Sequence, residues 1–239
     1  MPSLVTPALT AGSLSGLVQP EIKGEGVLLR PWQEGDRDTV VAGFADPAIQ
    51  RWHCRTMSED EATAWILGWP RRWHDKTDAG WAIVDCGGPL GERAGGGGAL
   101  GEPAGGGGAL GEPAGGGEAL GEPASGDGAL GEPAGAGAVV GQVGLRRIDL
   151  AEGLASISYW VLPGFRGQRF APRALGALTT WAFDVLGLHR LELSHSTANG
   201  ASCRVAVQAG YLAEGIKRSE ARHADGWHDM HQHARISTD

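Results

Sequence analysis

The chain has 239 residues and a formal net charge of −8, of which residues 87–137 contribute −6 while holding 22 of the 41 glycines. The remaining 188 residues are nearly neutral, which fits one folded domain and excludes a nucleic-acid binder that relies on attraction to phosphate charge. No apolar run reaches the roughly 18 residues that cross a bilayer, and no secretory signal is visible, so we expect no membrane partner.

Two segments lack the pattern of a folded element. Residues 1–24 are small and polar, with three prolines and no helical or strand period, and predict a flexible leader. Residues 87–137 repeat a decapeptide that contains one leucine per copy among many glycines. One leucine per copy cannot offset the entropy lost on ordering such a tract, so we interpret it as disordered, with a glycine-rich solenoid as the alternative. A single domain over residues 25–236, interrupted by this insertion, is therefore expected.

The rest of the chain alternates between strand and helix patterns. Ser58 and Glu61 form a capping box, and apolar residues follow at helical spacing, so residues 58–74 predict one helix. Strand patterns on both sides of the repeat predict a hairpin with an insertion at its tip. The predicted strands are 27–30, 81–84, 139–145, 154–161, 190–194, 211–218 and 227–236, and the predicted helices are 34–44, 58–74, 171–186 and 201–209. This order indicates a mixed sheet with packed helices, in the α+β class.

Residues 159–171 carry the clearest functional signal. A strand ends, a turn containing Arg166, Gly167 and Arg169 follows, and a helix begins near Ala171. The free amides and positive dipole of a helix N-terminus suit a phosphate or pyrophosphate, and the arginines add charge. The alternative is a solvated turn with ordinary surface arginines.

The motifs taken together resemble the GCN5-related N-acetyltransferase (GNAT) family, and most closely its ribosomal-protein N-terminal acetyltransferases. The resemblance covers residues 25–86 and 138–236. It rests on the order and spacing of five short motifs. In chain order these are Leu28-Leu29-Arg30-Pro31, Arg166-Gly167 with Ala171, Asn199-Gly200-Ala201-Ser202, Ala209-Gly210-Tyr211 and Asp225-Gly226-Trp227-His228-Asp229. It implies a mixed, mostly antiparallel sheet with helices on both faces. It also implies direct transfer of acetyl from acetyl-CoA to a primary amine, either a protein N-terminus or a small amine.

The resemblance also implies roles for individual residues. Backbone amides near Tyr159, Trp160 and Val161 would polarise the thioester carbonyl where the strand splays. The pyrophosphate would lie on the turn formed by Arg166, Gly167, Gln168, Arg169, Phe170 and Ala171. Arg169 stands where the family has a glycine, so its side chain either crowds the pyrophosphate or pairs with it.

Asn199 would bind the pantetheine or the reacting centre, and Ser202 would protonate the departing thiolate. The alternative is that Asn199 and Ser202 simply cap the helix that follows. The general base is open: Glu192 shares a strand face with Ser194 and is either that base or the partner of an arginine. Trp52 and His53 either shape the acceptor site or fill a surface turn.

The remaining expectations concern metals, location and assembly. His223, His228, His231 and His233 lie close in sequence but lack the usual ligand spacing, so we expect no metal. Cys54, Cys86 and Cys203 show no close pairing, which predicts free thiols and a cytoplasmic protein. For the assembly, we expect a monomer or a homodimer. A non-catalytic acyl-CoA-binding or scaffolding module is the alternative function.

Overall fold

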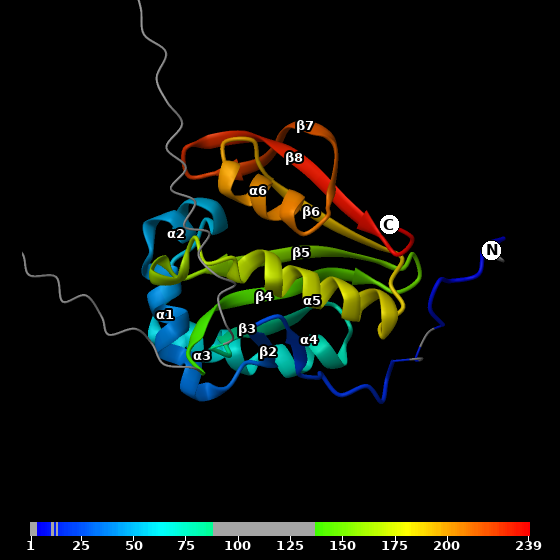
Figure 1. The fold of residues 1–239 in the computed structure, drawn as a ribbon, viewed down its shortest axis with the longest axis horizontal. Coiled ribbons are helices and arrows are strands. Elements are labelled where there is room, and N and C mark those ends of the chain that lie inside the picture. The colour runs from blue at the N-terminus through cyan, green and yellow to red at the C-terminus, as the bar shows by residue number, and fades with distance from the viewer. Residues whose placement is uncertain (1–3, 11, 13, 88–136) are drawn as a thin grey trace, which may run out of the picture. The chain divides into compact units, whose positions relative to one another are not determined.

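The computed structural model describes residues 4–10, 12, 14–87 and 137–239, so the predicted insertion lies outside the described residues except for Gly87 and Gly137. The described part contains an eight-stranded sheet with the order β1-β2-β3-β4-β5-β6-β8-β7 (Figure 1). Its strands are β1 Ile22–Gly24, β2 Val27–Pro31, β3 Ala79–Asp85, β4 Val139–Asp149, β5 Leu154–Val161, β6 Arg190–Ser196, β7 Leu212–His223 and β8 Gly226–Ile236. Only β5 and β6 pair in parallel; every other neighbouring pair is antiparallel.

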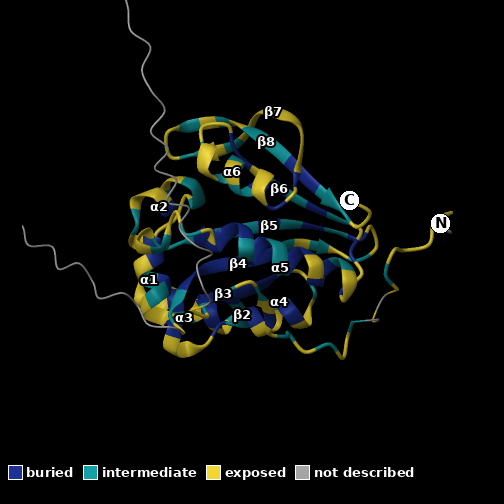
Figure 2. Ribbon diagram, in the orientation of Figure 1, coloured by how far each residue is buried: buried dark blue, intermediate teal, exposed yellow. Residues whose placement is uncertain are grey.

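Helices cover both faces of this sheet (Figure 1). They are η1 Glu34–Asp36, α1 Arg37–Ala45, α2 Pro47–His53, α3 Glu59–Leu67, α4 Trp69–His74, η2 Pro163–Phe165, α5 Phe170–Asp184 and α6 Gly200–Gln208. One buried cluster joins α5 and α6 to the sheet, and a second joins α1, α2 and α3 to Ala82 and Trp160. The middle strands are accordingly the most buried part of the molecule (Figure 2). The mixed, mostly antiparallel sheet expected from the sequence is confirmed.

The helical region after β2 differs from the prediction in two places. Residues 58–74 form two helices, since Gly68 ends α3 and Pro70 cannot donate the backbone hydrogen bond that a continuous helix requires. Residues 47–53, for which no element was predicted, form the short helix α2. There the Asp46 carboxylate caps the helix by accepting from the backbone N–H of Ile49 at 2.9 Å, and proline occupies the first turn.

The described residues of the predicted leader contact the domain. β1 lies within that segment and pairs with β2. The indole nitrogens of Trp73 and Trp81 each donate to a backbone carbonyl there, those of Leu17 and Pro20, both at 2.8 Å. Buried tryptophans that need an acceptor therefore hold this segment against the sheet.

Backbone hydrogen bonds join the ends of β3 and β4 at the point where residues 88–136 interrupt the sequence of the hairpin. The backbone N–H of Asp85 donates to Ala138 at 2.9 Å, and that of Gly137 donates to the carbonyl of Asp85 at 2.6 Å. The predicted hairpin strands on either side of the repeat are thus confirmed. Within the described residues, none of the helices has the length and apolar character that a bilayer crossing requires.

Candidate active site

A cavity opens where the two parallel strands separate. β5 and β6 pair only through Leu154–Arg190, Ala155–Leu191 and Ser156–Glu192, and the ladder stops there. Beyond that point the ends of both strands line a cavity of about 810 Å³, together with the first turns of α5 and α6. The strand divergence expected around Tyr159 to Val161 is therefore present, and it places the chain's most polar motifs around one space.

The turn before α5 presents a basic side chain to this cavity. Arg169 lies directly before the helix with φ 61°, a left-handed conformation that favours glycine, and no side chain caps the helix. Arg169 is exposed and lines the cavity, and within the described residues no hydrogen bond to its guanidinium is found. Arg173, by contrast, donates to the backbone carbonyls of Glu25, Gln168 and Arg169. Arg169 is therefore the arginine of this turn that can reach a ligand.

Arg166 fixes the turn to the neighbouring helix. Its guanidinium donates to the Asp46 carboxylate at 2.5 Å and to the Val161 carbonyl at 3.1 Å. Burial raises the pKa of the Asp46 carboxyl, but hydrogen bonds from Arg166 and from the N–H of Ile49 outweigh it, so that pKa lies below its ordinary value. Arg166 thus links the α5 turn to the N-terminus of α2 and is not free for phosphate.

Two hydroxyls face each other in the wall of the cavity. The Tyr159 hydroxyl lies 2.6 Å from Oγ of Ser202. Burial raises the pKa of Tyr159 to about 12, so this hydroxyl stays protonated near neutral pH. Asn199 behaves differently: its side chain accepts from the backbone N–H of Ser202 at 3.1 Å and caps α6. The structure therefore separates the two predicted residues into a helix cap and a member of a hydroxyl pair.

The opposite side of the cavity is formed by α2. His53 is half-buried, and its Nε2 donates to the carbonyl of Tyr159 at 3.2 Å. Burial lowers the pKa of His53, which keeps its imidazole neutral near neutral pH. Trp52 packs edge-on against His223 with ring centroids 6.0 Å apart. Both predicted acceptor-side residues, Trp52 and His53, line the cavity.

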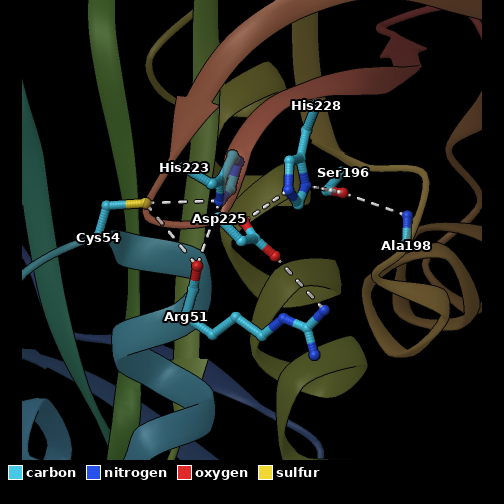
Figure 3. Close-up of polar contacts among 7 residues, drawn as sticks. All are labelled: Arg51, Cys54, Ser196, Ala198, His223, Asp225 and His228. Carbon is cyan, nitrogen blue, oxygen red and sulfur yellow. Dashed lines mark hydrogen bonds and ion pairs between the residues drawn. The ribbon is translucent and has the colours of Figure 1, made fainter.

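A chain of three polar side chains reaches the cavity from the β7–β8 turn (Figure 3). Nδ1 of His228 lies 2.7 Å from Oγ of Ser196, and its Nε2 lies 2.8 Å from the Asp225 carboxylate. An ionised carboxylate can only accept, so Nε2 carries the proton and Nδ1 accepts from the Ser196 hydroxyl. The backbone N–H of Ala198 donates to the same Ser196 oxygen at 3.2 Å. Ser196 lines the cavity and is 2% exposed.

This chain of side chains was missed by the sequence analysis, which named His228 only as part of a family motif and of a histidine cluster. Its one local signal is the Asp225-Gly226 turn, which sets Asp225 three residues before His228. Ser196 is distant in sequence and reaches His228 only through the antiparallel pairing of β6 with β8, in which it lies opposite Met230.

Glu192 is not among the residues that line the cavity. Its carboxylate accepts from Nε of Arg190 at 2.9 Å, and Arg190 also pairs with Glu214. The sequence left two roles open for Glu192, general base or partner of an arginine. This geometry favours the arginine partner. The role of Glu192 as a base stays a prediction, which the Glu192→Gln variant described below tests.

A family profile described as "Acetyltransferase (GNAT) domain" matches residues 27–111 and 119–212. Among curated proteins, the chain is 30% identical over 91 residues to the provisionally named ribosomal N-acetyltransferase YdaF of Bacillus subtilis (strain 168), covering 38% of this chain and 49% of YdaF. It is 28% identical over 80 residues to the uncharacterized N-acetyltransferase YoaA of the same strain, covering 34% of this chain and 45% of YoaA. These matches span about half the length of either relative.

Solved structures share the fold at low sequence identity. RimL, a ribosomal L7/L12 alpha-N-protein acetyltransferase in complex with coenzyme A, superposes with a TM-score of 0.65 and 16% identity, covering 92% of this chain and all of RimL. RimJ of Mycobacterium smegmatis, in complex with CoA-disulfide, gives a TM-score of 0.64 and 18% identity, covering 92% of this chain and 87% of RimJ. Identities this low support the shared fold alone.

Proposed function

The chain belongs to the acetyltransferase (GNAT) family, and from that premise we propose that it transfers an acetyl group from acetyl-CoA to a primary amine. The observation that carries this proposal is the cavity at the divergence of β5 and β6, with the Tyr159–Ser202 hydroxyl pair in its wall. Its volume of about 810 Å³ falls within the usual range for small-molecule sites.

The residues at the start of α5 fit the pyrophosphate of acetyl-CoA. The uncapped helix offers backbone N–H groups and its positive dipole end, and Arg169 supplies a guanidinium without a protein partner among the described residues. A Cβ added at Gly167 would meet nothing within 4 Å, so the backbone of the turn is open to a ligand. We assign the pyrophosphate to this turn, with Arg169 as its charged contact and Arg166 as the residue that holds the turn in place.

The transfer forms a bond between the amine nitrogen and the acetyl carbon and breaks the bond from that carbon to sulfur. The sulfur must gain a proton, and the Tyr159–Ser202 pair can supply one from the cavity wall. The amine must lose a proton. Ser196 can accept it while passing its own proton to Nδ1 of His228, whose Nε2–H is held by Asp225. We therefore assign the base to this relay and not to Glu192.

We propose the N-terminal amine of a protein as the acceptor, with small amines as the second candidate. The names of YdaF and RimL support this choice, because both refer to ribosomal proteins. The acceptor would enter between α2 and the turn of β7 and β8, where Trp52, His223 and Met230 line the cavity.

The test is the release of free thiol from acetyl-CoA with a panel of amines. We expect turnover with short peptides that have a free N-terminus and none with the same peptides blocked at the N-terminus. Polyamines and aminoglycosides form the small-amine arm. If the protein binds acetyl-CoA but releases no thiol from it with any of the amines, the result would instead support the non-catalytic acyl-CoA-binding module.

The relay is tested separately with His228→Gln, which removes the acceptor nitrogen. We expect kcat to fall by at least about tenfold, a threshold below the usual contribution of a general base of about 10²- to 10⁴-fold, because water can partly replace the base. His189→Gln is the matched control, because the His189 ring contacts Ser237 and has no contact with Ser196 or Asp225. Equal activity of the two variants would exclude His228 as part of the base.

A further inference from the structure

We propose that His195, Cys203, His231 and His233 form a binding site for one zinc ion. One ligand atom from each of these side chains lies within 4.8 Å of all the others. The set combines a thiolate with imidazoles, which is the donor chemistry that zinc prefers and that magnesium and calcium avoid. Four protein ligands make a closed site of the structural type, next to the candidate active site, whose cavity His195 also lines.

The fold brings these residues together from three elements. His195 on β6 lies directly opposite His231 on β8, and partners in an antiparallel ladder share a face of the sheet. His233 lies two residues further along β8 and points to the same face. α6 packs over this face and contributes Cys203, whose Sγ is 3.9 Å from Nδ1 of His231 and 3.9 Å from Nε2 of His233.

Two of the imidazoles are oriented as metal ligands. Nδ1 of His195 donates to the carbonyl of Ser196 at 2.8 Å, and Nδ1 of His233 donates to the carbonyl of Tyr211 at 3.4 Å. A carbonyl accepts only, so Nε2 of each ring carries the lone pair. A histidine that donates its second nitrogen to a carbonyl is the usual arrangement at zinc.

His195 supplies an independent sign that something is bound. Its side chain is 5% exposed, and its Nε2 has no hydrogen-bond partner within the described part of the chain. A buried polar nitrogen without a partner costs free energy, and a metal ion would satisfy it.

The spacing around Cys203 is close to that of a filled site. With the usual bond lengths, a tetrahedral zinc ion separates sulfur and nitrogen ligands by about 3.6 Å, and the two distances from Cys203 are each 3.9 Å. Small side-chain rotations would close the difference. The ion would then tie α6 to β6 and β8, and α6 carries Ser202 next to the ligand Cys203.

The test uses the full chain, reduced and stripped of metal with a chelator, and titrated with cobalt(II) as a spectroscopic substitute for zinc. We expect binding of one equivalent, intense visible bands typical of tetrahedral cobalt, and a thiolate-to-cobalt charge-transfer band. Zinc should displace the cobalt, and its addition should raise the melting temperature of the stripped protein. Octahedral spectra, or no binding at micromolar cobalt, would overturn the proposal.

Variants identify the ligands. Cys203→Ser should abolish the charge-transfer band, and His231→Gln, at a partly exposed position, should weaken metal binding by at least about tenfold. Cys86→Ser and Cys54→Ser are the matched controls and should keep the band. If Cys203→Ser does not fold, as judged by circular dichroism, His231→Gln decides alone. Loss of the band in Cys54→Ser but not in Cys203→Ser would contradict the site.

Discussion

The hydroxyl of Tyr159 and Oγ of Ser202 are separated by 2.6 Å. At this distance one hydroxyl donates to the other, and when Tyr159 is the donor the proton of Ser202 is left for an acceptor in the cavity. Because burial raises the pKa of Tyr159 to about 12, neither group ionises near neutral pH. We therefore propose that the pair shares the role of proton donor that the sequence analysis gave to Ser202 alone.

Removing either hydroxyl should slow the reaction without loosening the cofactor. We expect Ser202→Ala and Tyr159→Phe each to lower kcat by at least about tenfold, since a general acid contributes about 10²- to 10⁴-fold and water can partly replace it. The dissociation constant for CoA should stay within a few-fold of wild type. The double variant should be little worse than either single one, because residues that act as a unit are not additive.

Steady-state kinetics and calorimetric titration with CoA measure these effects, with Ser15→Ala as a control outside the cavity. The backbone N–H of Ser202 still meets Asn199 in Ser202→Ala, so the cap of α6 is kept. Unchanged kcat would reject the hydroxyl pair as donor. Loss of CoA binding in proportion to rate would show that the pair positions the cofactor instead.

Arg169 should contribute to CoA affinity through charge. Arg169→Ala is expected to weaken CoA binding by about 1.5–3 kcal/mol, the usual range for a hydrogen bond to a charged group. Arg169→Gly should lose the same affinity but gain about 1 kcal/mol of stability, since Arg169 has φ 61° and glycine adopts that conformation without strain. Tighter CoA binding by Arg169→Gly would show that the side chain crowds the site.

Deletion of residues 88–136, with Gly87 joined to Gly137, should leave folding intact. The hydrogen bonds between Asp85 and residues 137–138 already close the hairpin at that point. A shorter loop also loses less entropy when it closes, so the melting temperature should stay the same or rise. Calorimetry checks this, and a fall of more than roughly 10 °C would contradict it.

The Asp46–Arg166 pair should stabilise the domain in a pH-dependent way. The folded-state pKa of Asp46 lies below its value of 3.8 in the unfolded chain, so its contribution is complete above that pH and disappears as the pH falls through the folded pKa. Asp46→Asn keeps an oxygen to cap α2 but removes the charge. Because Arg166 is 42% exposed, we expect a loss of about 0.5–1 kcal/mol at neutral pH.

Urea unfolding of wild type and Asp46→Asn at a series of pH values measures this difference. It should be constant near neutral pH and vanish in strong acid. A difference that persists in acid would mean that Asp46 acts through the cap of α2 and not through its charge.

Glu192→Gln should leave kcat within about twofold of wild type, since its carboxylate pairs with Arg190 and lies away from the cavity lining. Arg190 keeps its second partner, Glu214, in this variant. A loss of rate comparable to that of His228→Gln would instead support Glu192 as the general base.

The local patterns of the sequence predicted most of the fold. Ser58 and Glu61 do form a capping box, and the turn at Asp225-Gly226 does join the last two strands. The break at Pro70 was missed because the apolar stripe continues through it, so spacing alone indicated one helix. The short β1 was missed because three residues carry too little pattern.

The site was predictable only where its parts are close in sequence. The turn at Arg169 and the pair of Asn199 and Ser202 lie on single strand–helix junctions. The contacts of Ser196 with His228, and of His195 with His231, depend on the register of β6 against β8, which a strand pattern does not fix.

The sheet is in effect two smaller sheets, β1–β5 and β6–β8, that share a seam of three residue pairs. A molecule seated beyond the end of that seam touches both halves and bridges them. Bound CoA should therefore make transient separation of the two halves less frequent. The backbone amides at the diverging ends of β5 and β6 should then exchange with solvent deuterium more slowly once CoA is bound. The weakest line of the fold and the place where the substrate binds would then be the same feature.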